Sequence, residues 1–216
     1  MPKVLVLASG GVESGLLVRE ALKGGREVTP LYVKCGFIWE KTELTRLKRL
    51  LARLKTHKLK PLVVARSDAR ALYGRHWSLD GAKVPGRKTP DSAVYLEGRN
   101  VLLLSQAGVV CARRGIPEIL IGTLAANPFP DGKETFFDAS GQWLAAGLGR
   151  RIRVKAPFRR LRKAEIARRA GREFLALTFS CIHPQGKQPC GKCNKCAERK
   201  VAFRKARITD PTYYAN

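Results

Sequence analysis

Four of the six cysteines lie close together near the C-terminal end, in the stretch SCIHPQGKQPCGKCNKC at 180–196. Their spacing is C-x8-C-x2-C-x2-C, formed by Cys181, Cys190, Cys193 and Cys196. Short C-x2-C turns let neighbouring thiolates converge on one ion, and tetrahedral zinc takes four such ligands. The spacing therefore predicts a structural zinc site, with an iron–sulfur cluster as the competing interpretation.

The other candidate ligands near this cluster are not needed for it. His183 is close to Cys181, but four thiols already complete a tetrahedral set. Cys35 and Cys111 stand apart in apolar surroundings and are interpreted as small buried residues. Clustered thiols in a reducing compartment bind metal more often than they form disulfides.

A glycine-rich segment, ASGGVESG at 8–15, follows an apolar run and precedes an amphipathic one. The amides of Gly10, Gly11, Val12 and Glu13 can point outward there, and a helix N-terminus adds positive charge, so the segment can bind a phosphate. A Gly-Gly pair after a strand is by itself a weak signal, and a simple tight turn is the competing interpretation of the same glycines. Neither G-x-x-x-x-G-K-[ST] nor G-x-G-x-x-G is present, which argues against a Walker-type kinase and a Rossmann dehydrogenase.

Alternating strands and helices must position these residues. Apolar, β-branched runs predict strands at 3–8, 27–36, 59–66, 118–125 and 151–157. Amphipathic stretches predict helices at 14–23, 40–56, 98–114 and 161–169. This order is typical of an α/β, Rossmann-like fold in which a parallel five-stranded sheet has helices on both faces.

Two regions interrupt the alternation. Residues 79–91 are rich in Gly, Pro and Lys and predict an exposed, mobile loop. The stretch NPFPDGKETFF at 127–137 is predicted to be a ligand loop beyond the carboxyl end of a strand. We expect one main domain, residues 1–175, with a zinc-binding segment, residues 176–216, packed on it.

The 216 residues include 42 Lys and Arg against 17 Asp and Glu, for a formal charge of +25. Such a field attracts tRNA or another polyanion, although solvated helix faces such as TRLKRLLARLKTHKLK at 45–60 explain many of the charges as well. No apolar stretch approaches the roughly 20 residues that span a bilayer. We therefore expect a soluble, cytoplasmic protein with no membrane partner.

The segment Ser9-Gly10-Gly11-Val12-Glu13-Ser14 resembles the S-G-G-x-D-S pyrophosphate loop of the PP-loop ATP pyrophosphatases, with Glu13 in place of Asp. Together with the cysteine tail, the chain resembles the QueC family of the queuosine pathway over nearly its whole length. The supporting stretches are YLEGRN at 95–100, IGTLAANPFPD at 121–131, APFRRLRKAEIARRA at 156–170, and the tail 180–196 followed by Arg199, Ala202 and Phe203.

The resemblance implies the adenine nucleotide alpha hydrolase (HUP-type) fold and an ATP-dependent ligase. Enzymes of this family adenylate a carboxylate and aminate it with ammonia, converting 7-carboxy-7-deazaguanine to 7-cyano-7-deazaguanine. The implied cofactors and cosubstrate are structural Zn²⁺ and ATP with Mg²⁺, and a homodimer is compatible with the family.

The resemblance also implies roles for individual residues. The catalytic residues would be Glu13, Arg99 and Lys163. Nucleotide would be bound by Ala8, Ser9, Gly10, Gly11, Val12, Ser14 and Gly15. Substrate would be bound by Asn100, Asp131 and Glu134. From chemistry alone, Lys163 could equally be a solvated lysine, Arg99 could form a surface ion pair, and Asn100 and Asp131 could be turn or cap residues.

Several positions depart from the family pattern: Glu13, Cys35 in place of Tyr, Glu97 in place of Pro, and the segment GKETFF at 132–137. The departures leave two alternatives open. One is a PP-loop enzyme of the same mechanism that acts on tRNA or a protein carboxylate. The other is a catalytically impaired zinc-containing RNA-binding protein.

Overall fold

The strands of this protein form one parallel sheet. The computed structural model describes residues 1–215. The strands are β1 (Lys3–Leu7), β2 (Glu27–Lys34), β3 (Val63–Arg66), β4 (Glu118–Leu120) and β5 (Arg153–Lys155). Their order is β3-β2-β1-β4-β5, and every neighbouring pair is parallel. The predicted α/β fold with a parallel five-stranded sheet is confirmed.

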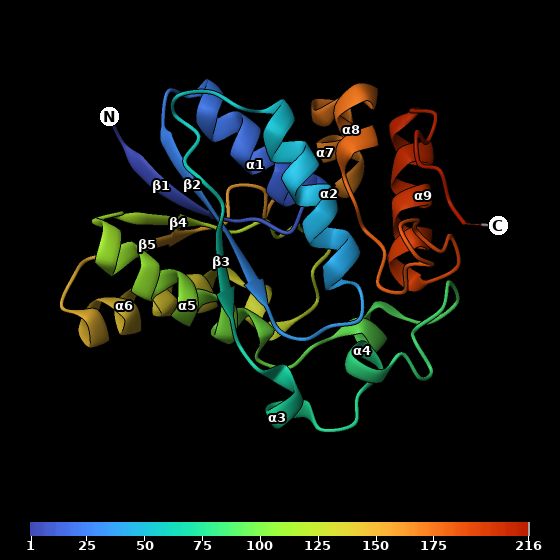
Figure 1. Ribbon diagram of the computed structural model, residues 1–216, viewed down its shortest axis with the longest axis horizontal. Helices are drawn as coiled ribbons and strands as arrows, with labels where there is room; N and C mark the ends of the chain where they lie inside the picture. Colours follow the sequence, from blue (N-terminus) through green and yellow to red (C-terminus); the bar gives the residue numbers. More distant parts are fainter. Residues whose placement is uncertain (216) are drawn as a thin grey trace.

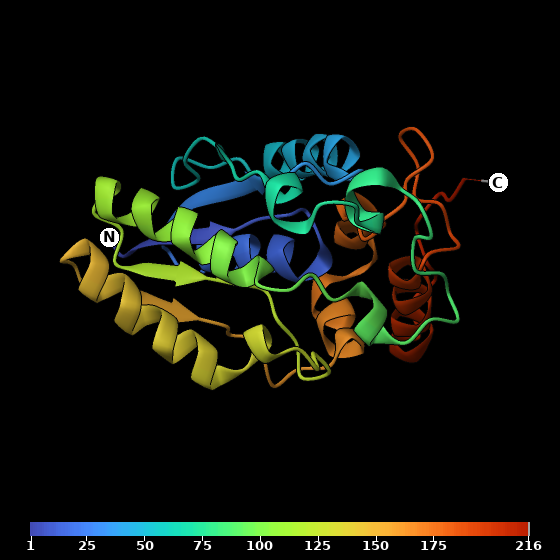
Figure 2. The same ribbon diagram turned by 90° about the horizontal axis from the view of Figure 1, so that it is seen from below.

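Helices cover both faces of the sheet. They are α1 (Val12–Lys23), α2 (Glu40–Arg53), α3 (Ala69–Tyr73), α4 (Trp77–Asp80), α5 (Arg99–Arg114), α6 (Glu134–Leu148), α7 (Lys163–Ala170), α8 (Arg172–Leu177) and α9 (Asn194–Ala206), with short 3-10 helices η1 (Asp91–Val94) and η2 (Pro130–Gly132). Figure 1 shows α1 and α2 on one side of the sheet and α5 and α6 on the other. Figure 2 shows α5 and α6 running side by side.

Alternate residues of β1 point to opposite faces and so belong to different cores. Val4 and Val6 pack with α1, α2 and α7 in one hydrophobic cluster. Leu5 and Leu7 pack with α5 and α6 in another. The side chains of β1 in both clusters are buried, as expected for the central strand of a parallel sheet covered on both sides.

The boundaries of several predicted elements differ from those observed. The second helix ends at Arg53, the third strand begins at Val63, and the fifth strand has only three residues. Residues 79–91 include the end of α4 and the start of η1. Helix α6 begins at Glu134, inside the segment 127–137 that was predicted to be a ligand loop, and its remaining length, α8 and α9 were not predicted.

The C-terminal segment shares a core with the sheet domain. Ala202, Phe203 and Ala206 of α9 belong to the same cluster as α1 and α7. Helix α8 crosses the predicted boundary between residues 175 and 176. In Figure 1, α9 lies on the side toward which the strands point. Among residues 1–215, no helix is both long and apolar enough to cross a membrane.

Candidate active site

A cavity of about 390 Å³ lies at the carboxyl ends of β1, β2 and β4. Its wall includes Leu7, Val33 and Ile121, at or just beyond the ends of these strands. The chain runs from β1 to β2 on one side and returns to β4 on the other, so this is the switch point of the sheet. Open parallel sheets bind ligands at that point.

The segment between β1 and α1 forms a compact loop at this edge. The Ser9 amide donates a hydrogen bond to Ser14 Oγ at 3.2 Å, and the Gly11 amide donates to Ser9 Oγ at 3.3 Å. The two hydroxyl oxygens are 3.2 Å apart. Helix α1 begins at Val12 directly after this turn. Its first amides have no partner one turn earlier, so the loop presents donors and a positive helix end to an anion.

Two glycines allow the close packing of this loop. Gly10 has φ +80°, and a Cβ there would lie 3.2 Å from the Cα of Leu47 on α2. Gly122, after β4, would carry a Cβ 3.0 Å from Glu13 Cβ and 3.2 Å from the Ser14 amide nitrogen. The Gly10 carbonyl also accepts a hydrogen bond from the Phe179 amide at 2.9 Å, which joins the loop to the segment before the cysteines.

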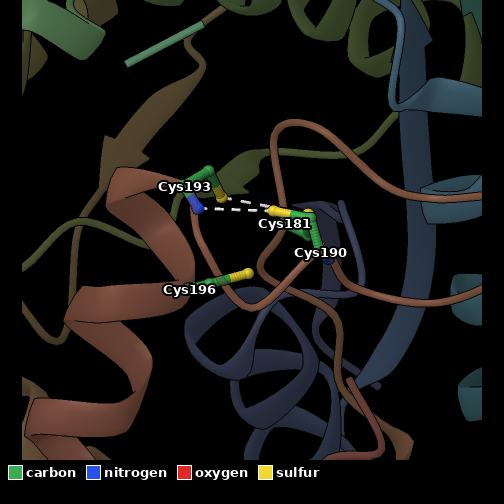
Figure 3. Close-up of side chains that lie close together, drawn as sticks. All are labelled: Cys181, Cys190, Cys193 and Cys196. Atoms are coloured by element: carbon green, nitrogen blue, oxygen red, sulfur yellow. Dashed lines mark hydrogen bonds between the residues drawn. The ribbon is translucent and has the colours of Figure 1, made fainter. Parts of the chain in front are cut away.

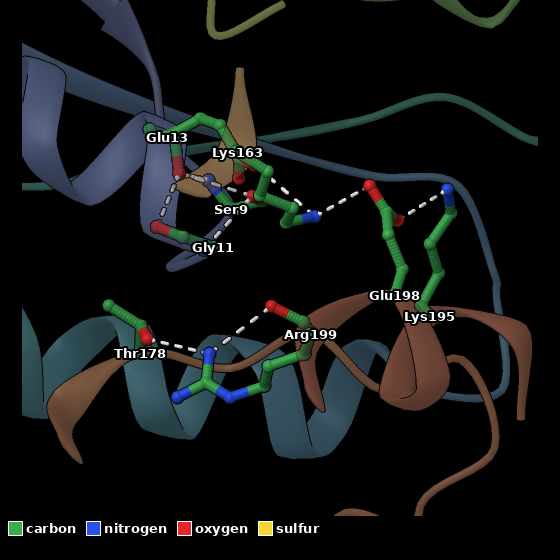
Figure 4. A network of polar contacts seen from close by, with 10 residues as sticks. Ser9, Gly11, Glu13, Lys163, Thr178, Lys195, Glu198 and Arg199 are labelled. Carbon is green, nitrogen blue, oxygen red and sulfur yellow. Dashed lines mark hydrogen bonds and ion pairs between the residues drawn. The ribbon is translucent and has the colours of Figure 1, made fainter. Parts of the chain in front are cut away.

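Lys163, the first residue of α7, extends its ammonium to the loop. Its Nζ lies 3.3 Å from Glu13 Oε1 and 3.0 Å from Glu198 Oε1 (Figure 4). Burial alone would lower the pKa of Lys163, but the charges of Glu13 and Glu198 raise it above its ordinary value. A lysine that stays protonated beside a helix N-terminus can contact phosphate oxygens.

Arg99 and Asn100 begin α5 at another wall of the cavity. The Asn100 amide donates to Asp131 Oδ2 at 3.2 Å, and Asn100 Nδ2 donates to the Asp131 carbonyl at 2.8 Å. Asn100 and Asp131 therefore satisfy each other and tie α5 to η2. Arg99 lies over the Phe37 ring at 5.6 Å, and its buried Nε has no hydrogen-bond partner among the described residues.

A carboxylate on α2 also lines the cavity. Glu43 accepts a hydrogen bond from the Tyr32 hydroxyl at 2.7 Å. Burial raises the pKa of Glu43 to about 7, although Arg99 and the Tyr32 hydrogen bond oppose this shift. Glu43 can therefore gain or lose a proton near neutral pH inside the cavity.

Most of the predicted site residues line the cavity. They are Ala8, Ser9, Gly11, Glu13, Ser14, Arg99, Asn100, Asp131 and Lys163. Gly10, Val12 and Gly15 support the loop instead: Val12 is fully buried, and a Cβ at Gly15 would meet Leu50 and Phe174.

Glu134 differs from this set. It begins α6 outside the cavity, where its largely exposed carboxylate pairs with Arg159. The cavity wall near this segment is formed instead by Asn127, Phe129 and Asp131. The position of Glu134 does not support a contact with substrate.

Sequence analysis missed several residues of the cavity. Lys195 and Glu198 of α9, Glu43, and the stacked rings of Tyr95 and Phe129, whose centroids are 4.5 Å apart, all line it. The signal available for Lys195 and Glu198 was their i,i+3 spacing beside the cysteines, which places both on one face of a helix.

The four predicted metal ligands converge. The sulfurs of Cys181, Cys190, Cys193 and Cys196 all lie within 4.8 Å of one another, and all four residues are buried (Figure 3). The sulfur of Cys181 is 3.6 Å from that of Cys190 and 3.9 Å from that of Cys193. Four sulfurs at about 2.3 Å from zinc would be about 3.8 Å apart, so the arrangement fits a tetrahedral site.

Backbone amides surround the same sulfurs. The amides of His183 and Cys190 donate to Cys181 Sγ at 3.3 Å, and the amides of Lys192 and Cys193 donate to Cys190 Sγ at 3.4 and 3.3 Å. Such donors stabilise thiolates and orient metal ligands. Within residues 1–215, no His side chain belongs to the cluster. The donor set of four sulfurs is the one that structural zinc sites use.

The fold is shared with a solved structure. The chain aligns over its whole length with 93% of a protein described as a predicted subunit of tRNA methyltransferase from Methanocaldococcus jannaschii, with a TM-score of 0.53 and 16% identity. At that identity the likeness concerns the fold alone.

Sequence comparisons are more specific. The chain is 30% identical to a 7-cyano-7-deazaguanine synthase of Methanothrix thermoacetophila, with 99% of each chain covered. It is 29% identical to one of Anaeromyxobacter dehalogenans, covering 99% of this chain and 96% of the relative. The family model for queuosine biosynthesis protein QueC matches residues 3–207. The chain therefore belongs to the QueC family.

Proposed function

We propose that this protein converts 7-carboxy-7-deazaguanine to 7-cyano-7-deazaguanine, with ATP as the activating cosubstrate and ammonia as the nitrogen donor. Membership of the QueC family makes the chain an ATP-dependent deazapurine synthase and a carbon–nitrogen ligase. The observation that carries the finer proposal is the loop from Ser9 to Ser14 at the start of α1, with the Lys163 ammonium beside it in a cavity at the switch point.

The loop is suited to the leaving group of the activation step. A substrate carboxylate oxygen attacks the α-phosphorus of ATP, and the bond to the β-phosphate oxygen breaks, so that pyrophosphate leaves with the negative charge. The α1 amides, the Ser9 and Ser14 hydroxyls and Lys163 can hold that charge where it develops. Glu13, at the same place, has the carboxylate oxygens that Mg²⁺ takes as ligands, and Mg²⁺ would offset the phosphate charge.

The nitrogen enters in the next steps. Ammonia attacks the acyl carbon, AMP leaves with the former carboxylate oxygen, and a proton is lost, which gives the amide. The amide oxygen then attacks the α-phosphorus of a second ATP with release of pyrophosphate. One N–H proton is lost from the O-adenylated amide, and departure of AMP with loss of the second N–H proton leaves the nitrile. Arg99, at the other wall of the cavity, can pair with the substrate carboxylate or the AMP phosphate.

The departures at residues 132–137 concern a region outside this cavity. Phe137 is buried in the core against α5, and Glu134 pairs with Arg159. These residues form the start of α6 rather than a substrate loop. The departures at 132–137 are therefore weak evidence against a deazapurine acid as the substrate. They are equally weak evidence for the alternative substrate, a carboxylate on tRNA or a protein.

The test is to incubate the zinc-loaded protein with ATP, Mg²⁺, ammonium and 7-carboxy-7-deazaguanine and to detect the nitrile by mass spectrometry and AMP by chromatography. We expect both products, and a loss of roughly 100-fold or more in Lys163→Gln. Lys60→Gln is the matched control, because Lys60 pairs with Glu27 at the opposite end of β2. AMP without nitrile would mean that another acid or amine is used. No acid-dependent AMP would contradict the proposed chemistry.

A further inference from the structure

The cysteine segment reaches into the cavity through two charged side chains. Lys195 and Glu198 lie one turn apart at the start of α9, and both line the cavity. In the tail pattern of the QueC family both fall on unspecified positions, C-x2-C-x2-R, so no role is assigned to them by the resemblance. Their position gives this tail a contact with the phosphate-binding loop.

Glu198 bridges two lysines. Its Oε1 lies 3.0 Å from Lys163 Nζ, and its Oε2 lies 2.9 Å from Lys195 Nζ. Lys163 is in turn shared with Glu13, at 3.3 Å. The four side chains thus form a continuous row from the loop to α9 (Figure 4), and Lys163 and Glu13 are each only 16% exposed.

The row is anchored from the α9 side. Cys193 and Cys196 stand on either side of Lys195 in the sequence and belong to the cysteine cluster. Arg199, next to Glu198, is 2% exposed and donates to Leu175 O at 2.8 Å and Thr178 Oγ1 at 2.9 Å. Glu198 therefore extends from a rigid part of the fold, whereas Glu13 belongs to the loop that must accommodate the nucleotide.

We propose that Glu198 is a positioning residue that holds the Lys163 ammonium at the phosphate end of the cavity, with Lys195 fixing the orientation of Glu198. The inference rests on the proposed function. When ATP with Mg²⁺ arrives, Glu13 gives up its contact with Lys163. Glu198 keeps the Lys163 ammonium in place, so this side chain is already positioned when it contacts the phosphates.

Simple electrostatics and this proposal predict opposite changes in nucleotide affinity when the charge of Glu198 is removed. Removing a carboxylate from a phosphate site makes the site more positive, which by itself tightens the binding of an anion. If Glu198 positions Lys163, Glu198→Gln weakens binding instead, because Lys163 is then held only by Glu13 and must be released from it.

Binding of α,β-methylene ATP with Mg²⁺ is measured by calorimetry on the zinc-loaded wild type, Glu198→Gln and Glu198→Asp. We expect the dissociation constant to rise on the order of tenfold in Glu198→Gln, with Glu198→Asp between the two, and kcat to fall in the same order. The KM for the acid stays within about twofold, which a general loosening of the tail would not allow. Glu173→Gln, on the exposed side of α8, is the matched control and should behave as wild type.

A dissociation constant in Glu198→Gln that equals or is lower than that of the wild type overturns the proposal. If Glu198→Gln does not fold, Glu198→Asp decides: a rise of about threefold supports the proposal, and a wild-type value overturns it. Failure of the wild type to bind the analogue would instead contradict the proposed function. The two failures are therefore distinguishable.

Discussion

At the scale of single residues, Glu43 is expected to make the stability of the folded protein depend on pH. Burial raises its pKa to about 7 from an ordinary 4.5. The charged or titratable groups that face it are Tyr32 on β2, Arg99 on α5 and Glu40 on its own helix. Between these two pH values the folded protein binds more protons than the unfolded chain, so its stability falls as pH rises from about 4.5 to 7.

Replacing Glu43 by glutamine should remove this fall in stability with rising pH. In Glu43→Gln the Tyr32 hydroxyl keeps an acceptor and no charge is buried. We expect the free energy of unfolding at pH 8 to be higher than in the wild type by on the order of 1–3 kcal/mol, with little difference at pH 4.5. Urea titrations at four pH values measure this. Asp138→Asn, on the exposed surface of α6, is the control, and an unchanged pH slope in Glu43→Gln would contradict the assignment.

The sequence predicted the site residues that belong to a local motif. It did not predict the residues that reach the cavity only through the packing of distant elements. The loop at Ser9–Ser14 and the four cysteines are local patterns, so their spacing alone predicts them. Glu43 and Glu198 come from charge-rich helices, α2 and α9, in which a charge normally faces solvent. Only the packing of α2 and α9 at the strand ends turns these two side chains toward the cavity.

At the scale of elements, the cysteine cluster and α9 form one unit. Helix α9 begins at Asn194, directly after Cys193, and Cys196 lies in its first turn. In Cys193→Ser we expect loss of one bound zinc per chain, measured by metal analysis. Because metal binding contributes folding free energy, we also expect the free energy of unfolding to fall by several kcal/mol, measured in urea. Cys111→Ala, in α5, should keep its zinc, and full metal content in Cys193→Ser would contradict a four-cysteine site.

Helices α6 and α9 were hidden from sequence analysis for physical reasons. Gly141 and Gly147 weaken the helical pattern of α6, and the prolines before it suggested a loop. Helix α9 lacks an apolar stripe, because Asn194 and Arg199 are buried together with Phe203. Strands β1 and β2 were predicted close to their observed bounds, since their apolar runs are buried on both faces.

At the scale of the whole molecule, the excess of positive charge is largely unpaired. Only seven of the 42 lysines and arginines form an ion pair with a carboxylate among the described residues. We expect binding of a labelled single-stranded RNA at low salt, measured by fluorescence anisotropy. Log K should fall with log salt with a slope of about −0.7 per phosphate neutralised. Absence of binding at about 50 mM salt would mean that these charges are only solvated helix faces.

The order of the sheet leaves β3 and β5 at its two edges. These strands have four and three residues, and β5 presents the exposed side chains of Arg153 and Lys155. Short edge strands with cationic side chains resist pairing with a strand of another molecule. Self-association through a continuous intermolecular sheet is therefore disfavoured, and the concentrated protein should resist fibrillation.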